Sequence, residues 1–346
     1  MNEWLDELAR ITLAGDSAVI VTVAGIRGSA PRECGAKMLV TKSETFGTIG
    51  GGQLEHECTR LAVGMLGAGQ SLSVRKFSLG SSMGQCCGGV VDILFEPVDA
   101  SARIWISQLQ SLQDKQEPAI VATRTGERWA KFILAASTTR TPAGLPVKVF
   151  ERARLLVDAQ LGAEQFDEYF LEPVVPTDFN LLVFGAGHVG AAVVRALSAI
   201  DCNIRWVDSR AQMFRKVPAG VQNVVTSEFA SEVKGAPSGS FYLIMTHSHA
   251  LDFEICDQVL RRGDAEYCGL IGSVSKRRRF EKSYKQQGMT DAQLKSLTCP
   301  IGVHGISSKK PAELAAAVTA ELLQVRERLS SMSLSDTTGS ARPARR

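Results

Sequence analysis

Apolar and polar residues along the first half of the chain alternate in patterns that predict helices and strands in mixed order. Residues 2–14 carry apolar side chains at helical spacing and end at Gly15, which predicts an opening helix. A glycine-rich loop at residues 48–52 leads into a second predicted helix at about 53–66. Strands are expected at residues 18–26, 36–41, 72–79 and 90–95 and near Ile120, Phe132 and Tyr169, with further helices after residue 101 and at about 147–160.

From Asn180 the pattern changes to short apolar strands that alternate with helices, which is typical of a parallel sheet covered by helices. These strands are expected at residues 181–184, 203–207, 221–225, 241–245 and 267–271. Pro311 suits the first turn of a last helix that ends near Leu329. The predicted fold class is α/β, with an N-terminal mixed α/β domain followed by a C-terminal Rossmann-like parallel-sheet domain.

The length of 346 residues exceeds what one hydrophobic core usually supports, so two domains are expected. Pro173 and Pro176 mark the boundary between them. The predicted parts are an N-terminal domain at 1–100, a middle section at 101–176 that completes it, a Rossmann-like domain at 177–329, and a disordered tail at 330–346 that is rich in Ser, Thr and Arg.

The charge and the cysteines narrow the class of protein. The formal net charge is only +3, so no nucleic-acid partner is indicated. Acidic residues interrupt the first apolar segment and no later apolar run reaches about eighteen residues, which predicts neither a signal peptide nor a membrane span. The 8 cysteines have no regular spacing, so we interpret them as thiols in a reducing, cytoplasmic compartment.

A glycine pattern follows the predicted strand at 181–184. Gly185, Gly187 and Gly190 form GxGxxG between a strand and a helix, the context in which this pattern predicts nucleotide binding. Gly185 permits the tight turn, Gly187 lets backbone approach phosphates, and Gly190 allows helix and strand to pack closely. Asp208, at the end of the next strand, is expected to accept hydrogen bonds from a ribose.

Two alternatives remain open for this pattern. The glycines can serve packing alone, and His188 can either crowd a diphosphate or contact it. Arg210, close to Asp208, leaves the choice between the two nicotinamide cofactors open.

Adjacent cysteines form a second, rarer motif. Cys86 and Cys87 lie between glycine pairs in a loop, where a role for their thiols explains them better than apolar packing does. A zinc site is disfavoured because nearby His56 and Cys58 would face different directions on a helix. A soft metal such as molybdenum, or a sulfur atom in transit, suits thiolate ligands.

Other residues fit either a ligand or a local structural role. The N–H groups of Gly50, Gly51 and Gly52 are candidates for binding a phosphate, and Glu55 either orients a polar ring or complements the helix dipole. His247, His249 and Asp252 have a spacing that suits a metal ion, but Asp252 can instead cap the following helix. The basic run at residues 276–279 is interpreted as a solvated helix face or a surface for an acidic partner.

The motifs together, in their order along the chain, resemble the xanthine dehydrogenase accessory (XdhC/CoxI-like) family. The match rests on residues 28–32, 47–55 and 84–89 in the first half and on residues 184–190, 246–252, 269–273 with Lys276, and 299–302 in the second. The resemblance implies a chaperone, rather than a conventional turnover enzyme, that binds molybdenum cofactor (molybdopterin). Such a protein protects the cofactor during sulfuration by a cysteine desulfurase and inserts it into a xanthine dehydrogenase-type apoenzyme.

The resemblance also suggests which residues hold the cofactor, with Cys86 and Cys87 as ligands of its molybdenum. The expected set is Gly50, Gly51, Gly52, Glu55, Gln85, Cys86, Cys87, Gly185, Gly187, His188, Gly190 and Asp208. A homo-oligomer is expected, and no membrane partner. The alternatives are an NAD(P)-dependent oxidoreductase and a carrier of persulfide sulfur on Cys86 or Cys87.

Overall fold

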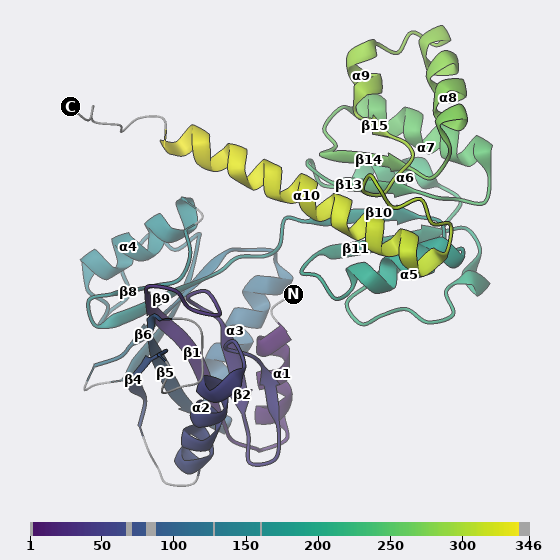
Figure 1. The fold of residues 1–346 in the computed structure, drawn as a ribbon. Coiled ribbons are helices and arrows are strands. Elements are labelled where there is room, and N and C mark those ends of the chain that lie inside the picture. Colours follow the sequence, from purple (N-terminus) through teal and green to yellow (C-terminus); the bar gives the residue numbers. More distant parts are fainter. Residues whose placement is uncertain (1–2, 67–70, 81–87, 127–128, 160, 339–346) are drawn as a thin grey trace. The chain divides into compact units, whose positions relative to one another are not determined.

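The chain forms two compact units, Asn2–Pro176 and Thr177–Arg346. The computed structural model describes residues 3–66, 71–80, 88–126, 129–159 and 161–338 (Figure 1). Among the helices within these ranges, none has the length and apolar character needed to cross a bilayer.

The first unit contains an antiparallel sheet with the strand order β3-β2-β1-β5-β4. Its strands are β1 (Ala18–Arg27), β2 (Lys37–Val40), β3 (Thr45–Gly47), β4 (Ser73–Ser78) and β5 (Val90–Val98). Side chains on β1 alternate between faces, as the period of a strand requires. Val19 and Val21 pack with Leu54 of helix α2 (Gly52–Met65). Ala18 and Ile20 pack with helices α1 (Glu3–Leu13) and α3 (Arg103–Asp114).

A second antiparallel sheet of the same unit has the order β7-β6-β9-β8. Its strands are β6 (Ala119–Arg124), β7 (Ala130–Ala135), β8 (Glu164–Phe166) and β9 (Tyr169–Val174). Helix α4 (Val147–Asp158) buries Val149, Phe150 and Leu156 against it. The strands expected near Ile120, Phe132 and Tyr169 and the helix at about 147–160 are therefore confirmed.

Buried ion pairs connect the first sheet to the second. Lys131 on β7 lies 2.8 Å from Glu96 on β5, and both side chains are almost fully buried. Lys37 on β2 lies 2.5 Å from Glu172 on β9. Lys131 also lies over the ring of Trp105, with its Nζ 4.3 Å from the ring centroid. Each pair neutralises a charge that would otherwise be costly to bury, so the two sheets are held together by polar contacts as well as apolar ones.

The second unit is built on a parallel sheet with the order β12-β11-β10-β13-β14-β15 (Figure 1). Its strands are β10 (Asn180–Phe184), β11 (Asn203–Asp208), β12 (Gln222–Val225), β13 (Phe241–Ile244), β14 (Tyr267–Leu270) and β15 (Leu297–Thr298). The first strand lies in the middle, and the chain then runs outward to one edge before crossing to the other side. This is the strand order of Rossmann folds, so the predicted fold class is confirmed.

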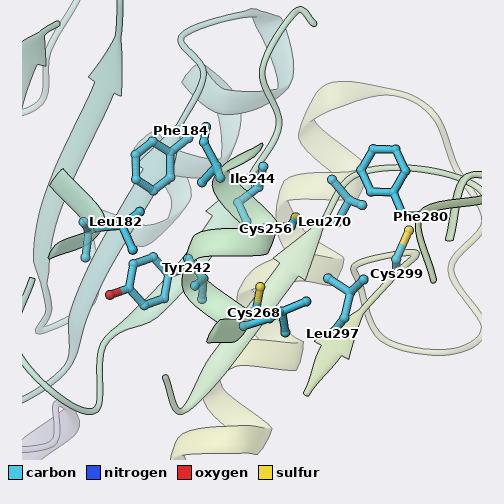
Figure 2. Packing of buried hydrophobic residues seen from close by; sticks show 14 of the residues in the cluster. Leu182, Phe184, Tyr242, Ile244, Cys256, Cys268, Leu270, Phe280, Leu297 and Cys299 are labelled. Atoms are coloured by element: carbon cyan, nitrogen blue, oxygen red, sulfur yellow. The ribbon is translucent and has the colours of Figure 1, made fainter. Parts of the chain in front are cut away.

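Helices cover both faces of the parallel sheet. Leu181 and Val183 of β10 pack in the cluster that includes helices α5 (His188–Leu197) and α10 (Pro311–Thr338). Leu182 and Phe184 point to the opposite face, where helices α6 (Phe229–Gly235), α7 (His249–Arg262) and α8 (Val274–Gln286) close the core, as Figure 2 shows in part. A short helix, α9 (Asp291–Lys295), precedes β15.

The end of the chain differs from the sequence prediction. Helix α10 continues to Thr338 instead of ending near Leu329, so residues 330–338 are helical and not disordered. Extending an existing helix adds one hydrogen bond for each residue fixed, which is less costly than starting a new helix. The remaining part of the predicted tail, residues 339–346, lies outside the described residues.

The ion pair between the two sheets of the first unit gives a stability prediction. Lys131→Ala should lower the free energy of unfolding by about 3–5 kcal/mol, because Glu96 would stay buried without its counter-charge. Urea unfolding followed by tryptophan fluorescence measures the loss.

The matched control is Lys148→Ala, which breaks a pair with Asp167 whose side chains are 67% and 43% exposed. This variant should lose less than about 1 kcal/mol. Equal losses of unfolding free energy in the two variants would show that burial does not determine how much the Lys131 pair contributes to stability.

Candidate functional site

The loops after β10 and β13 meet at the centre of the parallel sheet, where the strand order reverses. Gly185 has a φ of +110°, and a Cβ atom on it would lie 2.3 Å from the carbonyl oxygen of Met245. A Cβ atom on Gly190 would lie 2.0 Å from the carbonyl oxygen of Gly185. Both contacts are with backbone and leave no room for a side chain. Ligands of open α/β sheets bind in the crevice outside this point.

Helix α5 begins at the same crevice with an open N-terminus. Gly187 is its N-cap and provides no side-chain cap, and a Cβ atom there would meet nothing within 4 Å. His188, the first helical residue, is exposed. The first N–H groups of a helix have no partners within the helix and carry partial positive charge. The arrangement therefore suits an anionic group such as a phosphate.

Asp208 lies beside the glycine loop, but its carboxylate already has partners. One oxygen accepts from the backbone N–H of Ala186 at 2.7 Å, and Arg210 donates to both oxygens through its guanidinium at 2.9 Å. Burial favours a raised pKa for Asp208, but the hydrogen bonds from Arg210 and Ala186 outweigh it and lower the pKa. Asp208 thus ties the end of β11 to the glycine loop, and the hydrogen bond from a ribose that the sequence suggested stays a prediction.

A pocket of about 270 Å³ opens at the ends of β13 and β14. It is lined by residues from two segments, 246–252 and 271–276. At its wall Lys276 donates to Asp252 at 2.6 Å, and both side chains are buried. The sequence suggested a solvated face or a partner surface for residues 276–279, which is wrong for Lys276. Its helical spacing with Phe280 and Tyr284, both buried on α8, is the signal that could have shown this.

The structure gives a different role to the residues considered for a metal ion. Asp252 accepts hydrogen bonds from the N–H and the hydroxyl of Thr246, while His247 and His249 are exposed. Within the described ranges, no group of three or more His, Cys, Asp and Glu side chains is arranged to hold a metal. The helix cap is Ser248, which accepts from the N–H of Leu251, so Asp252 is not the cap either.

The glycine motifs of the first unit also come together. A Cβ atom on Gly89 would lie 2.2 Å from the carbonyl oxygen of Ser29, and one on Gly50 would lie 2.6 Å from Cγ of Pro31. The loop that contains Ser29 and Pro31 therefore touches two other loops that the sequence singled out. These contacts require glycine at both positions, since neither approach leaves room for a side chain.

Glu55 occupies the donors of the loop before α2. Its Oε2 accepts from the N–H groups of Ile49 at 3.1 Å and Gly51 at 3.0 Å and from the hydroxyl of Thr48 at 2.5 Å. The N–H of Gly50 donates to the Thr48 hydroxyl. Glu55 thus binds its own loop, so the Gly50 and Gly51 N–H groups are already used and are not free for a phosphate.

Gln85, Cys86 and Cys87 lie outside the described residues. The remaining cysteines are free thiols that are buried or half-buried. Burial raises the pKa of Cys34 and Cys202 to about 11 and that of Cys58 to about 12. These thiols stay protonated at neutral pH, and a protonated thiol is a poor nucleophile and a poor metal ligand.

Comparisons with known proteins cover both units. Residues 181–322 match the family described as XdhC Rossmann domain, and residues 12–78 match the XdhC and CoxI family. The uncharacterized protein YqeB of Escherichia coli is 26% identical over 151 residues, which are 42% of this chain but only 27% of that protein.

Other relatives match over nearly the whole chain. A protein of Bacillus subtilis, named as a probable xanthine dehydrogenase component, is 21% identical over 329 residues, or 91% of this chain and 94% of that one. A crystal structure named xanthine dehydrogenase, from Bacillus halodurans, has 23% identity and a TM-score of 0.74, with 94% and 96% of the two chains covered. At this identity the structure shows a shared fold.

The glycine loop predicts opposite effects for two of its positions. Gly190→Ala should lower the free energy of unfolding by about 3 kcal/mol, the upper end for overpacking, because its Cβ would collide with backbone. Gly187→Ser should keep or raise stability, because the position is open and serine is a good N-cap. Thermal unfolding of both variants checks this, and similar midpoints would contradict the geometry.

The contacts of Asp208 predict a dependence on pH. A carboxylate whose pKa is lowered by folding stabilises the fold above its ordinary pKa of about 3.9, and this contribution is lost as the pH falls through the lowered value. Asp208→Asn should therefore cost about 1.5–3 kcal/mol at pH 7 and progressively less in acid.

Unfolding free energies measured across the acid range test this dependence. Asp178→Asn, which changes an exposed carboxylate in the same unit, is the control and should show no such trend. A cost for Asp208→Asn that stays constant from neutral to acid pH would count against the proposed role.

Proposed function

The chain belongs to the XdhC and CoxI family, and on this premise we propose that it binds molybdenum cofactor and passes it to a xanthine dehydrogenase-type apoenzyme. The observation that carries the proposal is the open N-terminus of helix α5 at Gly187, next to the glycine loop at the centre of the parallel sheet. Molybdopterin has a phosphate group, and this is the kind of group that such a helix end stabilises.

The partial positive charge at this helix end suits the phosphate of the ligand. The N-terminus of α5 would hold the phosphate, and the exposed imidazole of His188 is placed to contact it. The bound cofactor would supply a molybdenum centre that the chain itself lacks. A site made of backbone donors and one exposed side chain would hold the phosphate without a covalent bond, so the cofactor could be released to the apoenzyme.

The sequence resemblance alone suggests Cys86 and Cys87 of the first unit as ligands of the molybdenum, and we propose this role independently of the helix end in the second unit. The other cysteines have thiols that burial keeps protonated or encloses in the core, so they are unsuited to this role. A cysteine desulfurase that sulfurates the cofactor on this protein is the second proposed partner. The contacts favour this proposal over a nicotinamide-dependent oxidoreductase, because the carboxylate that would bind the ribose, Asp208, is already held by Arg210.

The proposal is tested by the pterin content of the purified protein. Protein from cells that make molybdopterin should, after denaturation and oxidation, release a fluorescent pterin together with molybdenum. Gly187→Ser, Cys86→Ser and Cys87→Ser should each reduce pterin per folded monomer without lowering the thermal midpoint. Serine has nearly the volume of cysteine, but its hydroxyl is a hard and weakly acidic ligand that does not replace a thiolate.

The matched controls are Cys34→Ser and Cys202→Ser, which should keep their pterin. The thiol of Cys202 donates to the carbonyl of Leu197 at 3.3 Å, and a serine hydroxyl preserves that bond. Wild-type protein without pterin would overturn the proposal. Equal pterin in the four cysteine variants would remove Cys86 and Cys87 from the site and leave the crevice as the site of binding.

A further inference from the structure

The pocket at the ends of β13 and β14 has its own polar lining, apart from the glycine loop. Its lining comes from two segments, one at the start of helix α7 and one at the start of helix α8, with the residues Thr246, His247, His249, Asp252, Ile271, Gly272, Ser273 and Lys276. Its volume of about 270 Å³ lies below the roughly 300–1,000 Å³ of pockets for drug-sized ligands. A small ligand, or the end of a larger one, is what the pocket can hold.

Lys276 is the charged group of this pocket. Its side chain is 8% exposed, and Nζ donates to Asp252 at 2.6 Å and to the carbonyl of Ile271 at 2.9 Å. An ammonium group has three protons. Among the residues that the structure describes, no third oxygen accepts from Nζ, and the centroid of the Phe280 ring lies 5.5 Å away. A ligand in the pocket can therefore use this donor.

The negative charge of Asp252 is already balanced. Its side chain is 2% exposed, one oxygen accepts from Lys276, and the other accepts from the N–H of Thr246 at 3.0 Å and its hydroxyl at 2.7 Å. The carboxylate holds the ammonium in place and has little capacity left for a ligand. The local field in the pocket then depends on the remaining groups.

Two helices begin at the pocket and make this field positive. His249 is the first residue of α7, and Ser273 is the N-cap of α8, and both line the pocket. These helices have 14 and 13 residues, long enough for each N-terminus to act as about half a positive charge. Because Asp252 balances the charge of Lys276, the positive field comes from the two helix ends, and it disfavours a metal cation.

We propose that this pocket binds a phosphate-type oxyanion, either free phosphate or the phosphomonoester end of a larger ligand. Lys276, the hydroxyl of Ser273 and the N-termini of α7 and α8 supply the donors. The inference goes beyond the proposed function, since it requires no molybdenum cofactor.

Isothermal titration of the purified full-length protein with inorganic phosphate, at low ionic strength, tests the proposal. Ser273→Asp should weaken binding by about tenfold or more, because aspartate caps a helix as well as serine but places a negative charge at the pocket. Thr290→Asp is the matched control, since Thr290 caps α9 away from the pocket and the same charge there should leave binding unchanged.

Further variants separate this pocket from the glycine loop. His249→Glu repeats the charge test at an exposed first-turn position, where an acidic residue favours the helix, in case Ser273→Asp does not fold. Gly187→Ser should leave phosphate binding intact. Loss of binding in Gly187→Ser but not in Ser273→Asp would overturn the proposal, as would wild-type protein that binds no phosphate at millimolar concentrations.

Guanosine 5′-monophosphate distinguishes the two sources of the phosphate. If the nucleotide binds more tightly than phosphate, and if Ser273→Asp weakens its binding, the natural ligand is the phosphomonoester end of a larger molecule. Equal or weaker binding would support the free anion. A pterin-free protein that still binds phosphate in the predicted pattern would reject the proposed function while leaving this inference in place.

Discussion

The close backbone approach of the loops after β10 and β13 is the constraint on which the second unit depends. The chain can bring the carbonyl of Met245 against Gly185 only because no side chain intervenes at that position. The same contact places the N-terminus of α5 and the pocket beyond β13 at one edge of the sheet. Packing of the backbone therefore sets where the N–H donors of these helix ends lie. The side chains around them then determine the net charge at this edge of the sheet.

Three carboxylates among the candidate residues, two in the second unit and one in the first, hold loops through hydrogen bonds. Asp208 is bound by Arg210 and Ala186, Asp252 by Lys276 and Thr246, and Glu55 by the N–H groups of its own loop. Each takes up donors whose burial without a partner would be costly. The positive ends of the helices are then the main source of the electrostatic field near these loops. A positive field favours an anionic ligand over a cationic one.

The fold could be predicted from the sequence to a greater extent than the site. Strand and helix positions follow from local periodicity, and the glycine pattern after β10 was interpretable because it stands between a strand and a helix. The partners of Asp208 and Glu55 could not be foreseen, because a carboxylate binds whichever donors the fold brings near it. Lys276 was assigned to the surface by its charge, although its spacing with Phe280 placed it on the buried face of α8.

The ion pairs that join the two antiparallel sheets restrict how this sequence can diverge. Lys131 and Glu96 lie on different strands and are far apart in the chain, yet neither can change alone without leaving a buried charge. Replacing both by apolar residues is tolerated more easily than replacing either one. Evolution at these positions therefore depends on paired substitutions, and the intermediate with a single change is the barrier between two stable sequences.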